Sequence, residues 1–447
     1  MSFQQRLLDV IPGGAHTYSR GYDQFPTNAP QILSHGKGAY IFDDQGKRYL
    51  DYGMALRAVN IGYAEEEIDR AAIEQIQKGN NLTRPSLVEL EAAETIVDLI
   101  DSVDMVKFTK NGSTAVSAAV KLARAYTGRE MVARCAQHPF FSYDDWFIGS
   151  TPITKGVPES TIELTKIFDY NDIHSLECLI EAYPGQIACV VLEPATHECP
   201  VYEGDVRGDC SQSFDLSRMN FLQQVEVLCR QHGIVFVLDE MITGFRWHMQ
   251  GAQKIYGVSP DLCTFGKAMA NGYSVACVAG RRELMQQGSI ERIGEERLFL
   301  LSTTHGAEMV GLGAFLKTVE LMQRECVVEH LWGYGKDLMR LFQQLAEEER
   351  VQDHFIVEGP TCSPVYITLD NQGEPSLSFR TLFSQEMVKQ GVLMPWIALS
   401  WRHGEEEMAL TELAVRAAFK VYRQALDHGV DRFLEGPSIQ PVFRKYN

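Results

Sequence analysis

Two ionisable side chains, Asp239 and Lys267, each follow a short apolar run in this chain. The first run is Gly233-Ile-Val-Phe-Val-Leu-Asp239, and the second is Leu262-Cys-Thr-Phe-Gly266-Lys267. Apolar runs of this length are typical of buried strands in an α/β sheet, whose carboxyl ends meet in one crevice. A lysine amine can form a Schiff base with an aldehyde, and a carboxylate can keep a pyridine nitrogen protonated. Pyridoxal phosphate chemistry requires both groups.

Each residue also has a more ordinary interpretation. A lysine after Phe-Gly is most often a solvated loop residue, because charged side chains are seldom buried without a partner. An aspartate that closes a strand is often a helix cap or a turn residue. The two residues lie 28 positions apart, with Gly244-Phe-Arg246 and Tyr256-Gly-Val-Ser-Pro-Asp-Leu262 between them. Their joint occurrence favours the catalytic interpretation.

Three motifs read Asp239-Glu-Met-Ile-Thr-Gly-Phe-Arg246, Gly257-Val-Ser-Pro-Asp-Leu262 and Gly266-Lys-Ala-Met-Ala-Asn-Gly272. They resemble the motifs of class III (subgroup II) aminotransferases, and within that family those of glutamate-1-semialdehyde aminomutase. The resemblance extends from about Ile11 to about Arg423. It implies pyridoxal 5'-phosphate as cofactor and the fold type I of transferases that use it. That fold is α/β, with a large domain around a mostly parallel seven-stranded sheet and a small domain from the N- and C-terminal segments.

The apolar pattern along the chain predicts the same class of fold. From Met105 onward short apolar strands alternate with helical stretches, which is typical of a mostly parallel sheet covered by helices. Strands are expected over 105–109, 131–135, 187–192, 234–238, 262–265 and 275–279, helices over 65–78, 85–100, 115–126 and 407–426, and a hairpin over 38–52. The expected division is an N-terminal segment, 1–60, a large cofactor-binding domain, 61–320, and a C-terminal small domain, 321–447.

The cofactor phosphate needs an anion site, and helix N-termini provide one through amide groups and the helix dipole. The segment Lys110-Asn-Gly-Ser-Thr114 follows an expected strand and opens an expected helix, although an ordinary helix cap has the same composition. The resemblance implies that Gly112 and Ser113 bind the phosphate, with Asn111 in support. Thr114 departs from the family, which usually has Glu at this position.

The resemblance also implies an aromatic ring on the pyridine face of the cofactor. The segment Phe140-Phe-Ser-Tyr-Asp-Asp-Trp146 resembles the family's Tyr-His-Gly-x-x-Asp segment, which assigns the stacking role to Phe140. An aromatic cluster after a strand is otherwise most often core packing. On the opposite face, Met241 is the packing residue that the family implies.

A further segment implies shared active sites. Ser302-Thr-Thr-His-Gly-Ala-Glu308 resembles the family's Ser-Thr-Phe-Gly-Gly-Asn segment, whose Thr reaches the cofactor phosphate of the neighbouring subunit. Residue matching assigns this role to Thr304. The family therefore implies a homodimer in which each subunit completes the site of the other.

Substrate binding is assigned to arginine. Pro12-Gly-Gly-Ala-His-Thr-Tyr-Ser-Arg20 resembles the aminomutase segment whose Arg binds the substrate carboxylate. A guanidinium suits this task because its planar fork binds a carboxylate through two hydrogen bonds. We assign Arg20 this role, with Arg57 as the next candidate and a surface ion pair as the ordinary alternative. Leu56 and Ser400 replace the family's Trp and Glu, which puts strict glutamate-1-semialdehyde specificity in doubt.

These residues predict an enzyme that moves an amino group from an amino donor to a carbonyl acceptor, through a Lys267 aldimine and the pyridoxamine form of the cofactor. The alternative is glutamate-1-semialdehyde 2,1-aminomutase, an isomerase that transfers the amine within one molecule to give 5-aminolevulinate. Other pyridoxal phosphate chemistry, such as decarboxylation or racemisation, depends on the pocket. A non-catalytic relative would be expected to lose Lys267 or Asp239, and both are present. The motifs leave the donor and the acceptor open.

Composition restricts the partners and the location. The chain has 447 residues, and its net charge of −18 argues against nucleic acid, because neutralising phosphates requires basic patches. No apolar stretch reaches the 18 or so residues that span a bilayer, and no signal peptide is apparent, so we expect no membrane partner and a cytoplasmic location. The ten cysteines include no Cys-x-x-Cys pair, which predicts structural thiols, no disulfide framework and no metal site. A polar stretch over 202–214 is expected to be a surface loop.

Overall fold

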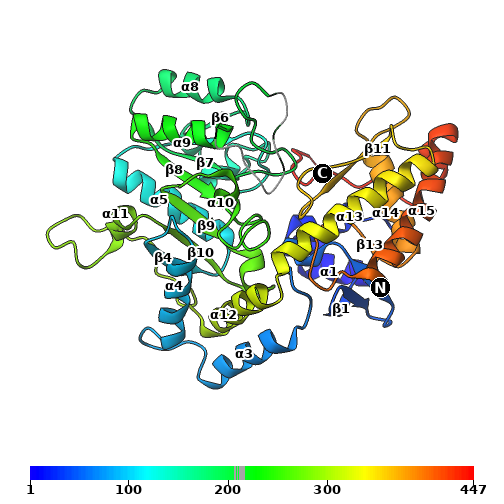
Figure 1. Cartoon of the computed structure of the whole chain (residues 1–447), viewed down its shortest axis with the longest axis horizontal. Helices are drawn as coiled ribbons and strands as arrows, with labels where there is room; N and C mark the ends of the chain where they lie inside the picture. Colours follow the sequence, from blue (N-terminus) through cyan, green and yellow to red (C-terminus); the bar gives the residue numbers. More distant parts are fainter. Residues whose placement is uncertain (206–207, 209, 211–216, 447) are drawn as a thin grey trace. The chain divides into compact units, whose positions relative to one another are not determined.

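The computed structural model describes residues 1–205, 208, 210 and 217–446, and it divides into two compact units. Unit 1 combines Met1–Glu65 with Glu329–Arg444, and unit 2 consists of Glu66–Val328 and the last residues of the chain (Figure 1). The N-terminal segment and most of the C-terminal segment thus fold together in unit 1. None of the helices in the described residues has the length and apolarity needed to cross a membrane.

Unit 2 contains a seven-stranded sheet with the order β4-β10-β9-β8-β7-β5-β6. The strands β5 to β9 pair in parallel, and β10 is antiparallel to both β4 and β9. The expected mostly parallel sheet is therefore confirmed, with β6 as a strand that the pattern did not predict. The strands are β4 (Met105–Thr109), β5 (Met131–Cys135), β6 (Thr165–Phe168), β7 (Ile187–Leu192), β8 (Val235–Asp239), β9 (Leu262–Phe265) and β10 (Ala276–Gly280).

Helices cover this sheet. Every residue of β7, β8, β9 and β10 is buried, as expected for central strands that are covered on both faces. Helix α5 (Gly112–Thr127) packs across β4 and β7 to β10, while α9 (Phe221–His232) packs on β8. The other helices of unit 2 are α3 (Glu66–Gln77), α4 (Leu87–Leu99), α6 (Asp145–Ile148), α7 (Glu159–Ile162), α8 (Ile173–Ala182), α10 (Ala252–Tyr256), α11 (Arg282–Met285) and α12 (Met309–Arg324), with the 3-10 turns η4 (Lys267–Ala270) and η5 (Gln286–Gly288).

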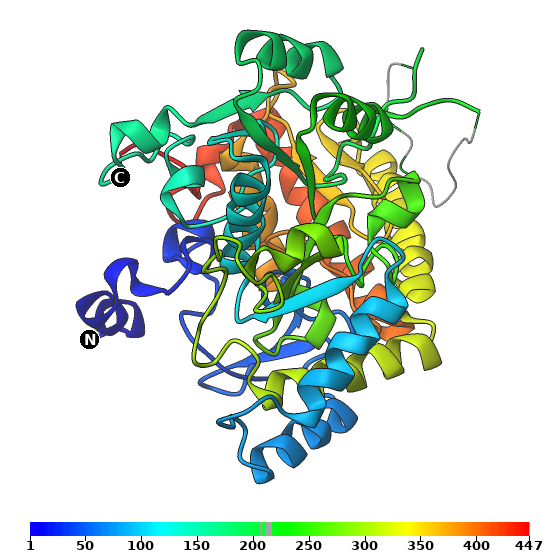
Figure 2. The same ribbon diagram turned by 90° about the vertical axis from the view of Figure 1, so that its left-hand side faces the viewer.

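Unit 1 is built around a four-stranded sheet with the order β1-β2-β3-β13. The expected hairpin is confirmed as β2 (Tyr40–Asp43) and β3 (Arg48–Asp51), and β13 (Val392–Leu393) pairs in parallel with β3. Helix α1 (Phe3–Val10) has no buried residue and stands out at the N-terminus in Figure 2. The remaining elements are β1 (Leu33–Lys37), α2 (Met54–Arg57), α13 (Val327–Glu348), β11 (Phe355–Glu358), β12 (Val365–Thr368), α14 (Leu377–Lys389) and α15 (Glu405–His428), with the 3-10 turns η1 (Pro12–Gly14), η2 (Tyr18–Arg20), η3 (Tyr22–Gln24) and η6 (Val430–Arg432).

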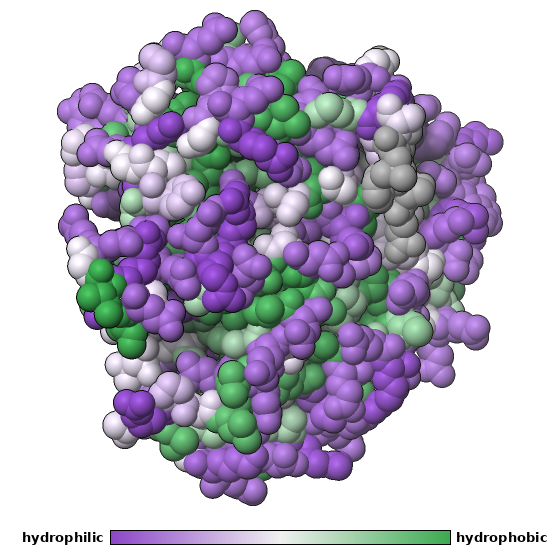
Figure 3. All heavy atoms as spheres, turned by 60° about the vertical axis from the view of Figure 1, so that its left-hand side comes forward, coloured by the Kyte–Doolittle hydropathy of each residue, from purple (hydrophilic) through white to green (hydrophobic). Residues whose placement is uncertain are grey.

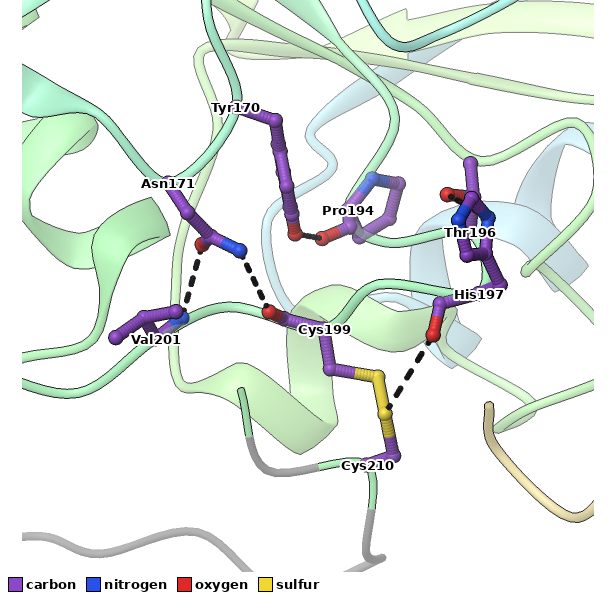
Figure 4. The surroundings of a disulfide bond; sticks show 8 residues. All are labelled: Tyr170, Asn171, Pro194, Thr196, His197, Cys199, Val201 and Cys210. Atoms are coloured by element: carbon purple, nitrogen blue, oxygen red, sulfur yellow. Dashed lines mark hydrogen bonds between the residues drawn. A yellow bond between two sulfur atoms is a disulfide. The ribbon is translucent and has the colours of Figure 1, made fainter. Parts of the chain in front are cut away.

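The expectation that every cysteine is a thiol was wrong. Cys199 and Cys210 form a disulfide with a Cα–Cα distance of 5.4 Å (Figure 4). The Asn171 side chain fixes the backbone around Cys199, since it donates to the Cys199 carbonyl at 3.0 Å and accepts from the Val201 amide at 2.9 Å. The spacing of 11 positions contains no known disulfide signature, so sequence patterns could not predict it. Most of the expected 202–214 loop lies outside the described residues.

Candidate active site

Asp239 is the last residue of β8 and lies at the carboxyl edge of the parallel strands. Its carboxylate is 2% exposed, and Oδ1 accepts hydrogen bonds from the Met241 amide at 3.0 Å and the Thr264 hydroxyl at 2.8 Å. Burial raises the pKa of Asp239 to about 6, although the positive charge of Lys267 and the two hydrogen bonds oppose the shift. Both hydrogen bonds engage Oδ1, and Oδ2 takes part in neither.

The neighbouring Glu240 has a different function. Its side chain is fully buried and accepts hydrogen bonds from the Thr243 hydroxyl and from the amides of Ala252 and Gln253 at 2.9 and 2.8 Å. Burial raises the pKa of Glu240 to about 7. Glu240 therefore binds the first turn of α10, whereas Asp239 is held at the end of β8.

Lys267 follows β9 after a single glycine and has an unusual backbone conformation. Its φ is +41°, in the left-handed region that residues with side chains seldom occupy. Such strained residues cluster at functional sites, where the surrounding structure holds them in place. The three residues that follow, Ala268–Ala270, are buried in the 3-10 turn η4, whereas Lys267 is only half-buried.

The Met241 side chain packs between the lysine segment and the first turn of α5. A Cβ atom on Gly266 would lie 2.6 Å from the Met241 sulfur, and one on Gly112 would lie 2.8 Å from it. Any larger residue at either position would displace the methionine. The fold thus brings Gly112, Met241 and the lysine segment together, and Met241 forms a small core cluster with Ala115 and Ala276.

The N-terminus of α5 has one side-chain cap and two amides without an acceptor among the described residues. The side-chain oxygen of Asn111 accepts from the Thr114 amide at 2.9 Å and from its hydroxyl at 3.0 Å. Within the described part of the chain, the amides of Gly112 and Ser113 bond to no acceptor, which is usual for a first helical turn. Asn111 thus acts as the helix cap, and the amides of Gly112 and Ser113 stay open to an acceptor from outside the helix.

The aromatic segment lies beside this first turn. The Tyr143 amide donates to the Ser113 hydroxyl, and the Ser142 hydroxyl donates to the Ser113 carbonyl, both at 3.3 Å. The ring of Phe140 is 47% exposed and contacts Phe147 edge to face, with 5.7 Å between ring centroids. Phe140 is therefore partly exposed, in contrast to a core residue.

Another buried carboxylate, Glu193, lies at the same edge of the sheet and was missed in the sequence. It follows β7 directly, is 3% exposed, and its amide donates to Nδ1 of the buried His138 at 2.9 Å. Burial lowers the pKa of His138 to about 3, which keeps its ring neutral. The signal was available, because Glu193 follows the apolar run Val190-Val-Leu192 just as Asp239 follows its strand.

Thr304 contacts other parts of unit 2. It is exposed, and its carbonyl accepts a hydrogen bond from the Asn81 side chain at 3.0 Å. The neighbouring His305 also contacts Asn81, at 3.3 Å through Nδ1. Thr304 thus presents its side chain at the surface of the subunit.

Unit 1 contains a cavity of about 930 Å³, and Arg20 lies on its wall. The guanidinium is exposed, and its charge partly offsets the rise in the pKa of Tyr63 that burial and the Asp51 carboxylate cause. Leu56 and Trp396 also line the cavity. The volume is at the upper end of the range for small-molecule sites.

Leu56 and Arg57 belong to a left-handed turn. The φ angles of Met54, Ala55, Leu56 and Arg57 are +41°, +49°, +62° and +65°. Each such residue costs about 1–2 kcal/mol relative to a right-handed conformation. The Arg57 guanidinium lies over the Trp396 ring, 5.9 Å from its centroid, within the range of a cation–π contact. Arg57 thus stacks on a residue of the cavity wall.

Ser400 is fully buried in unit 1. Its hydroxyl and its amide contact Nδ1 of His403 at 2.8 and 3.1 Å. The serine that replaces the family's Glu therefore closes a local turn with His403.

Comparisons with known proteins identify the family of this chain. The family model described as Aminotransferase class-III matches residues 18–363. The 3-aminobutyryl-CoA aminotransferase of Cloacimonas acidaminovorans (strain Evry) is 30% identical over 432 residues, which cover 95% of this chain and 98% of that protein. A glutamate-1-semialdehyde 2,1-aminomutase of Francisella philomiragia is 29% identical, over 79% of this chain and 78% of that protein. The structure of the FumI protein of Sphingopyxis sp. MTA144, in its PLP internal aldimine form, matches with a TM-score of 0.82 at 26% identity, over 95% of this chain and 97% of that one.

Proposed function

This chain belongs to the class III aminotransferases, and on that premise we propose that it transfers an amino group between an amino donor and a carbonyl acceptor that are separate molecules. The enzyme depends on pyridoxal phosphate, as its family does. The observation that supports the proposal most is the grouping of the lysine segment, the first turn of α5 and Met241, with Asp239 at the end of the neighbouring strand.

The residues of unit 2 fit this cofactor. Gly112 and Gly266 leave room around Met241 that a Cβ atom would fill, and the α5 amides are open to a phosphate. Gly112 and Ser113 would hold the phosphate, Phe140 would stack on the ring, and Asp239 would pair with the ring nitrogen. Lys267 would be the covalent attachment point.

When bound, the cofactor supplies an aldehyde for amines and a ring that withdraws electrons from the carbon next to the amine. The Lys267 amine would hold the cofactor covalently, and once free it would be the base that takes the proton from that substrate carbon. Asp239 is negatively charged above a pH of about 6, so its carboxylate would keep the ring nitrogen protonated.

Two observations favour transfer between molecules over the aminomutase reaction. Leu56 stands where the aminomutase has Trp, and Ser400, which replaces its Glu, is buried against His403. The aminotransferase relative also covers more of this chain than the aminomutase does. The decisive experiment is a screen of amino donors and keto or aldehyde acceptors that follows the cofactor absorbance. Efficient formation of 5-aminolevulinate from glutamate-1-semialdehyde, with no added donor or acceptor, would establish the aminomutase instead.

Replacing Arg20 by alanine should raise KM for a carboxylate-bearing substrate about 10- to 100-fold. This is the loss of a charge-assisted hydrogen-bonded pair, about 1.5–3 kcal/mol. KM for a neutral amine donor should change little, and steady-state kinetics with both donor types make the comparison. Equal loss with both donors would show that Arg20 is structural, and Arg57→Ala would then be the variant to measure.

We further propose a homodimer in which Thr304 reaches the cofactor phosphate of the partner. Hydrophobic side chains gather in patches at the surface in the view of Figure 3, and contiguous patches of this kind mark interaction surfaces. The large exposed hydrophobic residues of unit 2 include Leu82, Leu87, Ile290, Ile293 and Phe299. Sedimentation should give about twice the chain mass of 50.3 kDa, and Thr304→Ala should weaken cofactor binding about tenfold without dissociating the dimer. A monomer at micromolar concentration would contradict this assembly.

The proposed location is the cytoplasm. Eight of the ten cysteines form no disulfide, as is usual in a reducing compartment, and Cys199–Cys210 is the exception among the described residues.

A further inference from the structure

Asp51 is a buried carboxylate on the wall of the unit 1 cavity, and the proposed function gives it no role. It is 4% exposed, and Tyr63 lines the cavity beside it. Its Oδ1 accepts from the Gly53 amide at 2.7 Å, and its Oδ2 accepts from the Met54 amide at 3.0 Å and from the Tyr63 hydroxyl at 2.7 Å. Both oxygens are therefore engaged by donors.

These hydrogen bonds converge on the start of the left-handed turn at residues 54–57. The turn is closed by a hydrogen bond of 3.2 Å from the Arg57 amide to the Gly53 carbonyl, which also accepts from the Trp396 indole at 3.1 Å. Four consecutive residues with side chains stay left-handed only when their surroundings hold them there. Gly53 has no room for a side chain, because a Cβ would lie 2.9 Å from Asp51 Oδ1.

We propose that Asp51, supported by Tyr63, is a positioning residue that determines substrate specificity through this turn. The two residues hold positions 54–57 left-handed, which places Leu56 on the wall of the cavity that Arg20 also lines. The substrate class is an amine or carbonyl compound with a carboxylate, whose remaining chain fits against Leu56. This inference rests on the proposed function, since it requires Arg20 to bind the substrate carboxylate.

The variant Asp51→Asn tests the inference. Asparagine has the same size, but its amide nitrogen cannot accept a hydrogen bond. Either the Gly53 amide, or the Met54 amide and the Tyr63 hydroxyl, therefore lose their acceptor. We expect the Kd of the holoenzyme for succinate, a non-reacting dicarboxylate probe, to rise about tenfold in isothermal titration calorimetry. Tyr63→Phe removes one of the three hydrogen-bond donors to the Asp51 carboxylate and should raise the Kd for succinate about threefold.

A rescue and a control separate positioning from general stability. Adding Ala55→Gly to Asp51→Asn should return the Kd to within about threefold of wild type, because glycine adopts the left-handed conformation without support. A merely structural role predicts that the glycine restores the melting temperature while the Kd for succinate stays raised. Tyr49→Phe is the matched control, because this β3 hydroxyl contacts Asp43 at 3.4 Å and not the turn.

The outcomes distinguish this inference from the function on which it rests. An unchanged succinate Kd in Asp51→Asn, together with a raised Kd in Arg20→Ala, overturns the inference alone. Failure of the rescue overturns it as well. If the wild type does not bind succinate, or Arg20→Ala leaves its Kd unchanged, the carboxylate site of the proposed function is wrong and the inference falls with it.

Discussion

Replacing Lys267 by alanine is expected to abolish amino transfer, with turnover reduced by about 10⁴-fold or more. In the proposed function the amine is the covalent attachment point for the cofactor and the base that moves the proton, and alanine supplies neither. The cofactor should remain bound through the α5 amides, Phe140 and Asp239, but without a covalent bond. Borohydride treatment of the wild type should fix the cofactor on the peptide that contains Lys267, which mass spectrometry can identify.

The matched control is Lys254→Ala in the same unit. Lys254 is half exposed and pairs with Asp101 at 2.7 Å on the surface, so its loss should leave turnover unchanged. Labelling of a lysine other than Lys267, or residual turnover near wild type in Lys267→Ala, would remove the assignment.

Asp239→Asn should lower turnover by about 10³-fold while the fold is preserved. Removing one charge of a buried pair costs about 3–5 kcal/mol, and about 1.4 kcal/mol corresponds to a factor of ten. Asparagine can still accept from the Met241 amide and the Thr264 hydroxyl, so the local structure should hold. Asp101→Asn, at the surface, is the control for the same chemical change. Near wild-type turnover in Asp239→Asn would mean that another group protonates the ring.

The same carboxylate predicts how cofactor binding depends on pH. Burial raises the pKa of Asp239 to about 6 in the cofactor-free protein, so it is charged above this pH and neutral below it. A neutral carboxyl group cannot stabilise a protonated ring nitrogen. Cofactor affinity should therefore fall as the pH drops below about 6, by at most about tenfold per unit. Equilibrium dialysis between pH 5 and 8 measures the cofactor affinity. The Asp239→Asn variant should not show the fall in affinity below about pH 6.

Local patterns predicted most of the sheet in unit 2. The expected strand over 187–192 matches β7, and the strands that end at Asp239 and near Lys267 were recognisable because central parallel strands are apolar throughout. β6 was missed, since only its first and last residues are buried and its four residues form too short a pattern. The antiparallel direction of β10 was also not predictable, because apolar runs do not encode the direction of pairing.

Asp239 and Lys267 were likewise proposed as a pair from residue type and spacing, since Asp239 ends β8 and Lys267 follows β9 after a single glycine. Contacts between distant segments were not. The Met241 sulfur fits between Gly112 and Gly266, which are 154 positions apart in the chain, and Glu193 reaches the same edge of the sheet from β7.

The sequence by itself therefore determined the fold class and the cofactor, and it proposed Asp239 and Lys267 as the reacting groups, because short-range burial and hydrogen bonding dictate strands, caps and the residues that follow them. Only the tertiary structure decided the conformation of residues 54–57, which have ordinary helix-forming side chains yet are left-handed. The physical reason is that the hydrogen bonds that offset the cost of this turn come from separate segments of the chain. Asp51 and Tyr63 lie near the turn in sequence, whereas Trp396 comes from the C-terminal segment.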